Sequence, residues 1–271
     1  MKKEIPLWTN EIPFFDESFG QPCPSITYIP PCAGNALLPC AERGCVIVLP
    51  GGGYGVLCDY EGEPVAQMYA DAGYGAFVLH YRVKPYTYRA MLADVHRAVR
   101  TVRFLAEEYA INPNKIAVLG FSAGGHLAAM AAEHFDGGSS DGDEIDRCSS
   151  RPDAALLCYP VITLSGVHTH IGSRDNFLGD RCHDSRLQKV YSAECAVRSD
   201  MPPVFLWHTA DDEMVDVRNT LAMTEAVRSV GVSVESHVIL HGPHGMSLCE
   251  NDPHNGTWKL LSCQFLQALG F

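Results

Sequence analysis

Short runs of mostly apolar residues recur along the chain, and stretches with helical periodicity separate them. The run at residues 45–50, for example, is bounded by proline and glycine. Continuous apolar runs of this kind are typical of strands that are buried on both faces of a parallel sheet. We therefore predict strands at residues 45–50, 76–81, 115–120, 154–159, 203–208 and 233–240.

Helical periodicity fills several of the intervals between these runs. The clearest case has apolar residues at steps of three and four, which form one stripe on a helix: Met91, Val95, Ala98, Val102 and Leu105. A second helix is expected to begin near Glu63, because Pro64 suits the first turn of a helix. Strands alternating with helices predict an α/β fold, a mostly parallel sheet with helices on both faces. The 271 residues suit a single domain, 1–271.

Two longer stretches fit neither pattern. Residues 135–152 are polar, acidic and rich in turn-forming residues, and we expect a mobile surface loop there. The alternative, a calcium site at its carboxylates, is disfavoured because the loop lacks the glycine and the terminal glutamate of an EF-hand. Residues 162–201 form a longer excursion between two strands, with room to line a pocket.

An acidic composition narrows the range of partners. The chain has 20 Lys and Arg residues against 32 Asp and Glu residues, a formal net charge of -12. Such a surface repels nucleic acid and anionic lipid, so we expect neither as a partner and favour neutral substrates. No apolar stretch reaches the length of a membrane span, and the first residues lack the pattern of a signal peptide. We therefore expect a soluble, cytoplasmic protein.

Cysteine is frequent but does not predict a disulfide scaffold. The 11 cysteines are an odd number, spread through a chain large enough to fold without disulfides, so we expect reduced thiols. The densest group lacks CxxC spacing and ordered histidine partners, which disfavours a zinc site: Cys23, Cys32, Cys40 and Cys45. We expect neither a metal nor a cofactor.

Ser122 lies in the sequence GFSAGG, between Gly120 and Gly124. A predicted strand precedes this serine and a predicted helix follows it, which is the context of the G-x-S-x-G nucleophile elbow. The small neighbours allow a turn too sharp for bulky side chains, and the helix N-terminus stabilises negative charge near the hydroxyl. The backbone N–H of Ala123 would then donate to an oxyanion. We predict that Ser122 is a catalytic nucleophile.

A serine hydroxyl needs a base and an orienting carboxylate, and both types of residue follow later strands. Asp211 and Asp212 come directly after the strand predicted at 203–208, and His241 and His244 lie on the glycine-rich loop that follows the last predicted strand. The chain order is serine, aspartate, histidine, as in α/β hydrolases. The residues alone do not separate the two aspartates or the two histidines.

A glycine loop, LPGGGYG, directly follows the first predicted strand. Glycines let backbone N–H groups approach a reacting carbonyl, so this loop is the candidate for the second part of an oxyanion hole. A dinucleotide fingerprint that starts at Gly51 would need glycine at the position of Val56, and the Gly-Lys-Ser/Thr of a phosphate loop is absent. Both nucleotide-binding interpretations therefore fail.

Together these residues resemble the α/β-hydrolase superfamily, and within it the small carbohydrate esterases, which include acetylxylan-esterase-like proteins and relatives of feruloyl esterases. The resemblance runs from about Val46 to the C-terminal helix. It rests on the motifs PGGGY, EGEPVA, LHYRV, GFSAGGHLA, LWHTADDEMV and GPHG. Two departures are Pro50, where many related lipases have the histidine of HGGG, and Asp216, where a proline commonly follows the D-x-x-V valine.

The resemblance assigns roles to particular residues. It selects Asp212 as the acid, because this aspartate begins the D-x-x-V motif, and it selects His244 of GPHG as the base. It also implies that Gly52 and Gly53 donate to the oxyanion together with Ala123. It places Tyr54 beside the substrate. His126 in GGHLA is expected to be structural.

The resulting expectation is a serine carboxylesterase that removes small acyl groups, acetyl above all, from a sugar or an oligosaccharide. A serine peptidase related to prolyl oligopeptidase is one alternative, disfavoured because the residues before Cys45 are too few for a gating domain. The other alternative is a non-catalytic binding protein on a hydrolase core. A homo-oligomer stays open.

Overall fold

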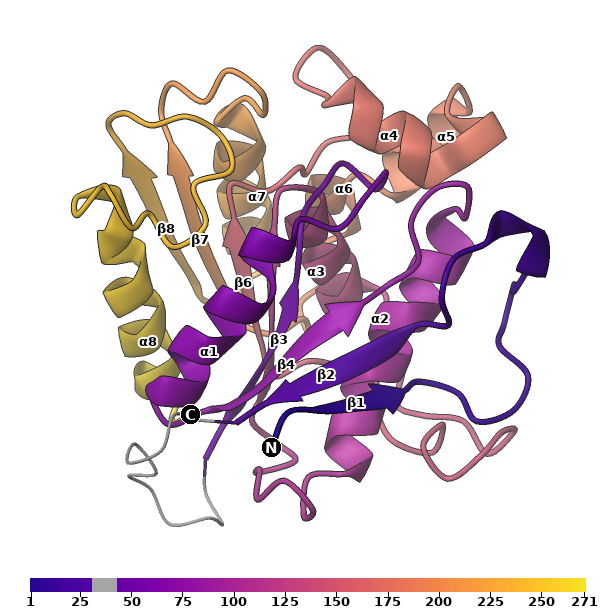
Figure 1. The fold of residues 1–271 in the computed structure, drawn as a ribbon. Helices are drawn as coiled ribbons and strands as arrows, with labels where there is room; N and C mark the ends of the chain where they lie inside the picture. Colours follow the sequence, from indigo (N-terminus) through magenta and orange to yellow (C-terminus); the bar gives the residue numbers. More distant parts are fainter. Residues whose placement is uncertain (31–42) are drawn as a thin grey trace.

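An eight-stranded sheet forms the centre of the molecule (Figure 1). The computed structural model describes residues 1–30 and 43–271. The strand order is β1-β2-β4-β3-β5-β6-β7-β8. The strands are β1 (Lys3–Pro6), β2 (Ser25–Ile29), β3 (Cys45–Leu49), β4 (Gly75–His80), β5 (Ile116–Phe121), β6 (Ala154–Cys158), β7 (Val204–Thr209) and β8 (Val234–Ile239). Six of these agree with the predicted strands to within one residue at each end.

The sheet is parallel from β4 to β8 and antiparallel at one edge. β2 pairs antiparallel with β1 and with β4, and the other neighbouring strands pair parallel. The sequence analysis did not predict β1 or β2. β1 is mostly exposed, and β2 alternates apolar Ile26 with polar Thr27, so neither forms a continuous apolar run.

Helices cover both faces of the sheet and create a core on each side. The longer ones are α1 (Glu63–Asp71), α2 (Tyr88–Phe104), α3 (Ala123–Glu133), α7 (Arg218–Ser229) and α8 (Trp258–Ala268). Along β3, Cys45, Ile47 and Leu49 join one core with α2, α3 and α7, whereas Val46 and Val48 join the other core with α1 and α8. This alternation explains why the strand is apolar at every position.

The predicted excursion at 162–201 contains three short helices. They are α4 (Ile171–Leu178), α5 (Ser185–Val190) and α6 (Ala193–Ala196). Figure 1 shows α4 and α5 beyond the carboxyl ends of the strands, on the side where the loops after β3 and β5 also lie. The excursion therefore borders the end of the sheet at which the candidate catalytic residues were expected.

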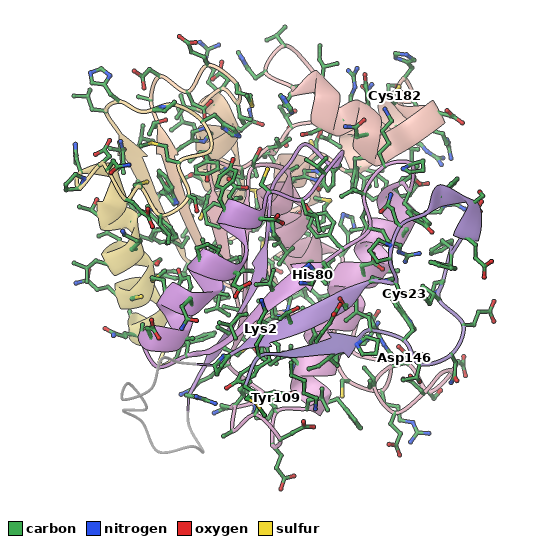
Figure 2. The ribbon with its side chains drawn as sticks, viewed as in Figure 1. Lys2, Cys23, His80, Tyr109, Asp146 and Cys182 are labelled. Atoms are coloured by element: carbon green, nitrogen blue, oxygen red, sulfur yellow. The ribbon has the colours of Figure 1, made fainter. Side chains whose placement is uncertain are left out.

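The acidic stretch 135–152 is a loop, as predicted, and ion pairs bind it to α2. Arg97 is almost fully buried and donates to Asp143 and, at 2.7 Å, to Asp146, which Figure 2 labels. Two carboxylates of the loop thus attach it to α2 through one guanidinium.

The cysteines within the described residues are free thiols. There are nine of them, and Cys23 and Cys182, for example, lie on separate parts of the surface (Figure 2). Two members of the group weighed as a zinc site, Cys32 and Cys40, lie outside the described residues. In the described ranges there is no group of three or more His, Cys, Asp or Glu side chains suited to a metal ion, and no helix long and apolar enough to cross a membrane.

Candidate active site

Ser122 occupies the sharp turn between β5 and α3. Its φ is 52°, outside the region that most side chains adopt. Gly120 and Gly124 make this turn possible, because a Cβ on Gly120 would lie 2.0 Å from the carbonyl oxygen of Gly124, and a Cβ on Gly124 would lie 2.2 Å from that of Leu49. The flanking glycines thus have the packing role that the sequence predicts.

His244 lies between Ser122 and Asp212. Its Nε2 is 2.8 Å from Oγ of Ser122, and its Nδ1 is 2.6 Å from Oδ2 of Asp212. A carboxylate only accepts, so Nδ1–H donates to Asp212 and Nε2 is left to accept the serine proton. All three side chains are at least nine-tenths buried, apart from the small exposed edge of the imidazole. The structure therefore brings together the three residues selected from the sequence.

Asp212 is held by four donors. Its Oδ1 accepts from the backbone N–H groups of Met214 and Val215, both at 2.9 Å. Its Oδ2 accepts from His244 and, at 3.2 Å, from Nε2 of His208. Burial raises the pKa of Asp212, but the hydrogen bonds from His208 and His244 lower it by more than burial raises it. The pKa of Asp212 is therefore below its ordinary value. Asp212 is therefore a carboxylate at neutral pH.

His208 belongs to the motif LWHTADDEMV, but the motif alone predicted no role for it. It is fully buried, and its Nε2 donates to the carbonyl oxygen of Val215 at 2.9 Å as well as toward Asp212. Its Nδ1 meets the hydroxyl of Thr220 at 2.8 Å. His208 thus fixes the loop that carries Asp212. Its signal in the sequence is a polar residue inside an apolar strand.

Asp211 and His241 form a second pair beside the first. His241 Nδ1 is 2.9 Å from Oδ2 of Asp211, and both side chains are more than half exposed. Within the described residues, neither side chain forms a hydrogen bond with Ser122, whereas His244 reaches Ser122 directly. The geometry thus separates the two aspartates and the two histidines, which residue order alone left open.

The glycine loop after β3 lies against the serine turn. A Cβ placed on Gly51 would lie 3.1 Å from Cβ of Ser122. Within the described residues, the N–H groups of Gly52, Gly53 and Ala123 donate to no protein acceptor. For Ala123 this is common, because the first N–H groups of a helix have no partner within the helix. These donors suit an oxyanion, and their catalytic role stays a prediction.

Tyr54 does not border the open side of the site. Its side chain is fully buried, and its hydroxyl is 2.7 Å from Nδ1 of His126. His126 in turn contacts the carbonyl oxygen of Tyr191 at 2.7 Å through Nε2. The expectation that Tyr54 contacts the substrate is therefore wrong, because the ring fills the core beneath the loop. His126 has the structural surroundings that were expected of it.

Glu61 connects the glycine loop to the loop that carries His244. It begins the motif EGEPVA, for which the sequence predicted no role. Its Oε2 accepts from the N–H of Gly51 at 2.8 Å, and its Oε1 accepts from the hydroxyl of Tyr159 at 2.7 Å. That hydroxyl accepts in turn from the N–H of Ser247 at 2.9 Å. Burial raises the pKa of Glu61, and the hydrogen bonds from Tyr159 and Gly51 oppose this rise. The carboxyl group is thus a buried junction between two parts of the site.

Helix α4 is bonded to the same glycine loop from the opposite direction. Asn176 donates through Nδ2 to the carbonyl oxygen of Gly53 at 2.9 Å. Phe177 is fully buried, and its ring lies 4.9 Å from the ring of Tyr54. The excursion 162–201 is therefore packed onto the glycine loop, a contact that the sequence did not predict.

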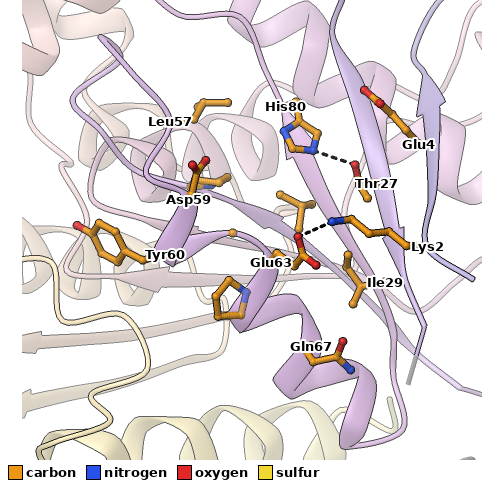
Figure 3. A pocket seen from close by; sticks show the side chains of 14 residues that line it. Lys2, Glu4, Thr27, Ile29, Leu57, Asp59, Tyr60, Glu63, Gln67 and His80 are labelled. Carbon is orange, nitrogen blue, oxygen red and sulfur yellow. Dashed lines mark hydrogen bonds and ion pairs between the residues drawn. The ribbon is translucent and has the colours of Figure 1, made fainter. Parts of the chain in front are cut away.

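A groove of about 1030 Å³ lies apart from these residues, between α1 and the edge formed by β2 and β4 (Figure 3). Ion pairing between Lys2 and Glu63 and a 2.9 Å hydrogen bond between Thr27 and His80 occur among its lining residues. Tyr60 also lines it, with its hydroxyl 3.1 Å from the position of a Cβ on Gly245. Ser122, Asp212 and His244 are not among the residues that line this groove.

The mostly parallel sheet with helices on both faces is the α/β-hydrolase fold. A solved α/β hydrolase, MGS-M1 from a Medee basin deep-sea metagenome library, is similar to the chain with a TM-score of 0.73 at 27% identity, over 100% of this chain and 98% of that one. This agreement confirms the fold class predicted from the alternation of strands and helices.

Within that fold, the chain belongs to the BD-FAE family, which matches residues 39–227. A solved acetyl ester-xyloside bifunctional hydrolase from Caldicellulosiruptor lactoaceticus is 41% identical, with a TM-score of 0.92 over 99% of this chain and 97% of that one. The predicted resemblance to carbohydrate esterases is thereby confirmed.

Two curated relatives are longer proteins. Endo-1,4-beta-xylanase B of Butyrivibrio fibrisolvens is 36% identical over 80% of this chain and 34% of its own length. The acetylxylan esterase of Xylanibacter ruminicola is 32% identical over 83% of this chain and 44% of its own length. The chain thus spans less than half of either relative.

Proposed function

We propose that the chain is a serine carboxylesterase that hydrolyses short-chain acyl esters, acetyl esters above all, of sugars or oligosaccharides. The observation that carries the proposal is the continuous hydrogen-bonded series from Ser122 through His244 to Asp212, with distances of 2.8 and 2.6 Å. A nucleophile, a base and an orienting carboxylate in this order are what acyl transfer through a serine requires.

Acylation begins when Oγ of Ser122 attacks the ester carbonyl and its proton passes to Nε2 of His244. The negative charge that develops on the carbonyl oxygen is stabilised by the N–H groups of Gly52, Gly53 and Ala123. The bond to the alcohol oxygen then breaks, and His244 gives its proton to the leaving alcohol. Asp212 holds the imidazole in its tautomer and stabilises the imidazolium.

Deacylation repeats these steps with water in place of serine. His244 takes a proton from water, the resulting hydroxide adds to the acyl carbon, and the bond to Oγ of Ser122 breaks. The proton returns to Ser122, and the carboxylic acid leaves. Every proton is carried by His244, so the reaction needs neither a metal nor a cofactor.

The substrate class is supported by the relatives and by the charge of the chain. Two similar proteins are named as an acetylxylan esterase and as an acetyl ester-xyloside bifunctional hydrolase. The net charge of -12 favours a neutral ester over an acidic one. A cytoplasmic location belongs to the same proposal, because the nine cysteines of the described residues are all free, which suits a reducing compartment.

The peptidase and binding-protein alternatives are less well supported. Two of the similar proteins carry esterase names, and one solved relative, from Lactobacillus plantarum, is named as a carboxylesterase. A protein that only binds a ligand has no need of a buried serine, histidine and carboxylate in hydrogen-bonding order. Both alternatives remain outcomes of the experiment.

The test combines active-site labelling with product analysis. A fluorophosphonate probe should label the wild type and a Ser229→Ala control, which removes an exposed hydroxyl at the end of α7, but not Ser122→Ala. Ser122→Ala should lower kcat for acetate release by about a thousandfold or more. Absence of labelling supports the binding protein, and release of amines from peptide amides without release of acetate from acetylated sugars supports the peptidase.

A further inference from the structure

His170 directly precedes α4, the helix that packs onto the glycine loop, and the tautomer of its ring follows from its contacts. As the residue before α4, it accepts through Nδ1 from the backbone N–H of Ser173 at 3.3 Å, and the hydroxyl of Ser173 is 2.7 Å from the same nitrogen. A backbone N–H only donates, so Nδ1 carries no proton. The proton of the neutral ring is therefore on Nε2.

The ring of His170 remains neutral at physiological pH. Burial is the largest cause that lowers the pKa of His170, and the nearby His244 lowers it further, although Asp212 raises it. The electrostatic interactions of His170 with His244 and Asp212 show that its ring lies near the candidate catalytic residues. Nε2 is thus an uncharged N–H donor rather than part of an imidazolium.

The ring of His170 lies beside the glycine loop, next to the candidate oxyanion hole. A Cβ placed on Gly53 would lie 4.0 Å from Cε1 of His170, the ring carbon next to Nε2. The bond from Asn176 to the carbonyl oxygen of Gly53 holds α4 and the loop in this arrangement. The ring is half-buried, and within the described residues no acceptor bonds to Nε2. An open N–H donor next to Gly53 is therefore built into the site.

We propose that Nε2–H of His170 donates a hydrogen bond to a hydroxyl oxygen of the sugar whose acyl ester is cleaved. The inference rests on the proposed function. The carbonyl oxygen of an acetyl group is already matched by the backbone donors of Gly52, Gly53 and Ala123, and the acetyl group has no other acceptor. The remaining acceptors near the ester belong to the sugar, so His170 recognises the alcohol part of the substrate.

His168, two residues earlier, provides a contrast. Its Nδ1 is 3.1 Å from Oδ2 of Asp216, and its ring also contacts Arg218. Both contacts are with residues that lead into α7 and not with the glycine loop. The two histidines of the sequence HTHIG thus have different surroundings, and of the two it is His170 that lies beside the glycine loop.

The test is the substitution His170→Asn, with His168→Asn as the matched control. Asparagine is a good residue before a helix, since its Oδ1 can accept from the N–H of Ser173, but it has no group at the position of Nε2. Hydrolysis is measured with an acetylated xylo-oligosaccharide and with p-nitrophenyl acetate, whose alcohol part has no hydroxyl. For His170→Asn, kcat/KM should fall about three- to tenfold on the sugar ester and stay unchanged on p-nitrophenyl acetate.

The remaining outcomes are distinct. His168→Asn should leave the ratio of the two kcat/KM values as in the wild type. If His170→Asn lowers both activities equally, or lowers neither, His170 does not recognise the sugar, and the proposed esterase function is unaffected. If the wild type hydrolyses p-nitrophenyl acetate but not the acetylated sugar, the proposed substrate class fails and the inference fails with it.

Discussion

At the scale of single residues, the backbone of Ser122 is strained, and its neighbours fix it. A non-glycine residue at φ 52° and ψ -116° costs about 1–3 kcal/mol relative to a relaxed backbone. The N–H of Ser122 donates to the carbonyl oxygen of Cys158 at 3.0 Å, and its own carbonyl oxygen accepts from His126 and Val161, each at 3.1 Å. These bonds to β6 and α3 hold Oγ at the distance that His244 requires.

The two adjacent aspartates should differ sharply in their effect on catalysis. Asp212→Asn replaces an acceptor of the Nδ1–H of His244 with an amide that can stabilise the wrong tautomer, so kcat should fall by up to about four orders of magnitude. Asp211→Asn affects an exposed pair and should change kcat by less than about twofold. The measurement is kcat on an acetate ester for both variants. A larger loss in Asp211→Asn would reverse the assignment.

The sequence predicted the residues that carry chemical motifs better than those that support them. Ser122 was found because its turn needs small neighbours, and that requirement appears in the sequence as glycine spacing. Asp212 and His244 were selected only through family resemblance, because spacing cannot show which of two nearby side chains of one type points inward. Tyr54 was assigned from the same resemblance, which does not show that its ring packs into the core. Glu61 was missed because its partners, Gly51 and Tyr159, are distant in the chain.

At the scale of elements, the predicted and missed strands differ in how they are buried. Of the six strands found from the sequence, β3, β5, β6 and β7 are buried at every position, whereas β8 at the edge is only partly buried. β1 and β2 form the antiparallel edge, where polar side chains reach solvent or neighbouring edge residues. Helices α4 to α6 are short, and contacts with the glycine loop stabilise α4, which no local periodicity reveals.

Glu61 provides an element-scale prediction, because it links the end of β3 to the loop after β8. In Glu61→Gln, the side-chain NH₂ would face either the N–H of Gly51 or the hydroxyl of Tyr159, which already accepts from Ser247. One buried donor is then left without an acceptor. The free energy of unfolding should fall by about 1–3 kcal/mol in urea denaturation, and kcat should fall as the glycine loop loosens.

Glu63→Gln is the control for this prediction, because it makes the same chemical change two residues away. Glu63 pairs with Lys2, and both side chains are more than half exposed. Exposed ion pairs contribute about 0–1 kcal/mol, so Glu63→Gln should stay within that range and leave kcat unchanged. Equal stabilities of the two variants would show that the junction at Glu61 does not hold the site together.

At the scale of the whole molecule, the parallel sheet explains how residues far apart in sequence meet. The loops after β3, β5, β7 and β8 carry the glycine loop, Ser122, Asp212 and His244 in turn. Because these strands are parallel, their carboxyl ends lie at one edge of the sheet, where α/β proteins commonly bind ligands. The order of motifs along the chain thus predicted a common site. It did not predict that α4 packs onto the glycine loop of that site.

The packing of α4 onto the glycine loop also bears on which acyl-chain lengths the site can accept in a substrate. Of the apolar residues that the sequence offered near the site, Phe177 and Leu178 are buried in the core beneath α4, and Ile171 is 60% exposed. Ile171 is thus the one large apolar side chain that α4 exposes, and it does not by itself make the extended apolar groove that a long acyl chain needs.

The last prediction is a preference for short acyl groups. In an enzyme with an apolar acyl groove, each buried methylene contributes about 0.8 kcal/mol, so kcat/KM rises about fourfold for each added carbon. Here the large groove beside α1 is lined by other residues, and the buried apolar side chains of α4 already pack against the core around Tyr54. Added methylenes would remain in water or displace the contacts between α4 and the glycine loop. On a series of p-nitrophenyl esters, kcat/KM should therefore be highest for acetate or propionate and decline steadily toward octanoate. If the octanoate ester is instead the better substrate, an apolar channel must open at α4. The contacts of α4 with the glycine loop would then belong to only one conformation of the site.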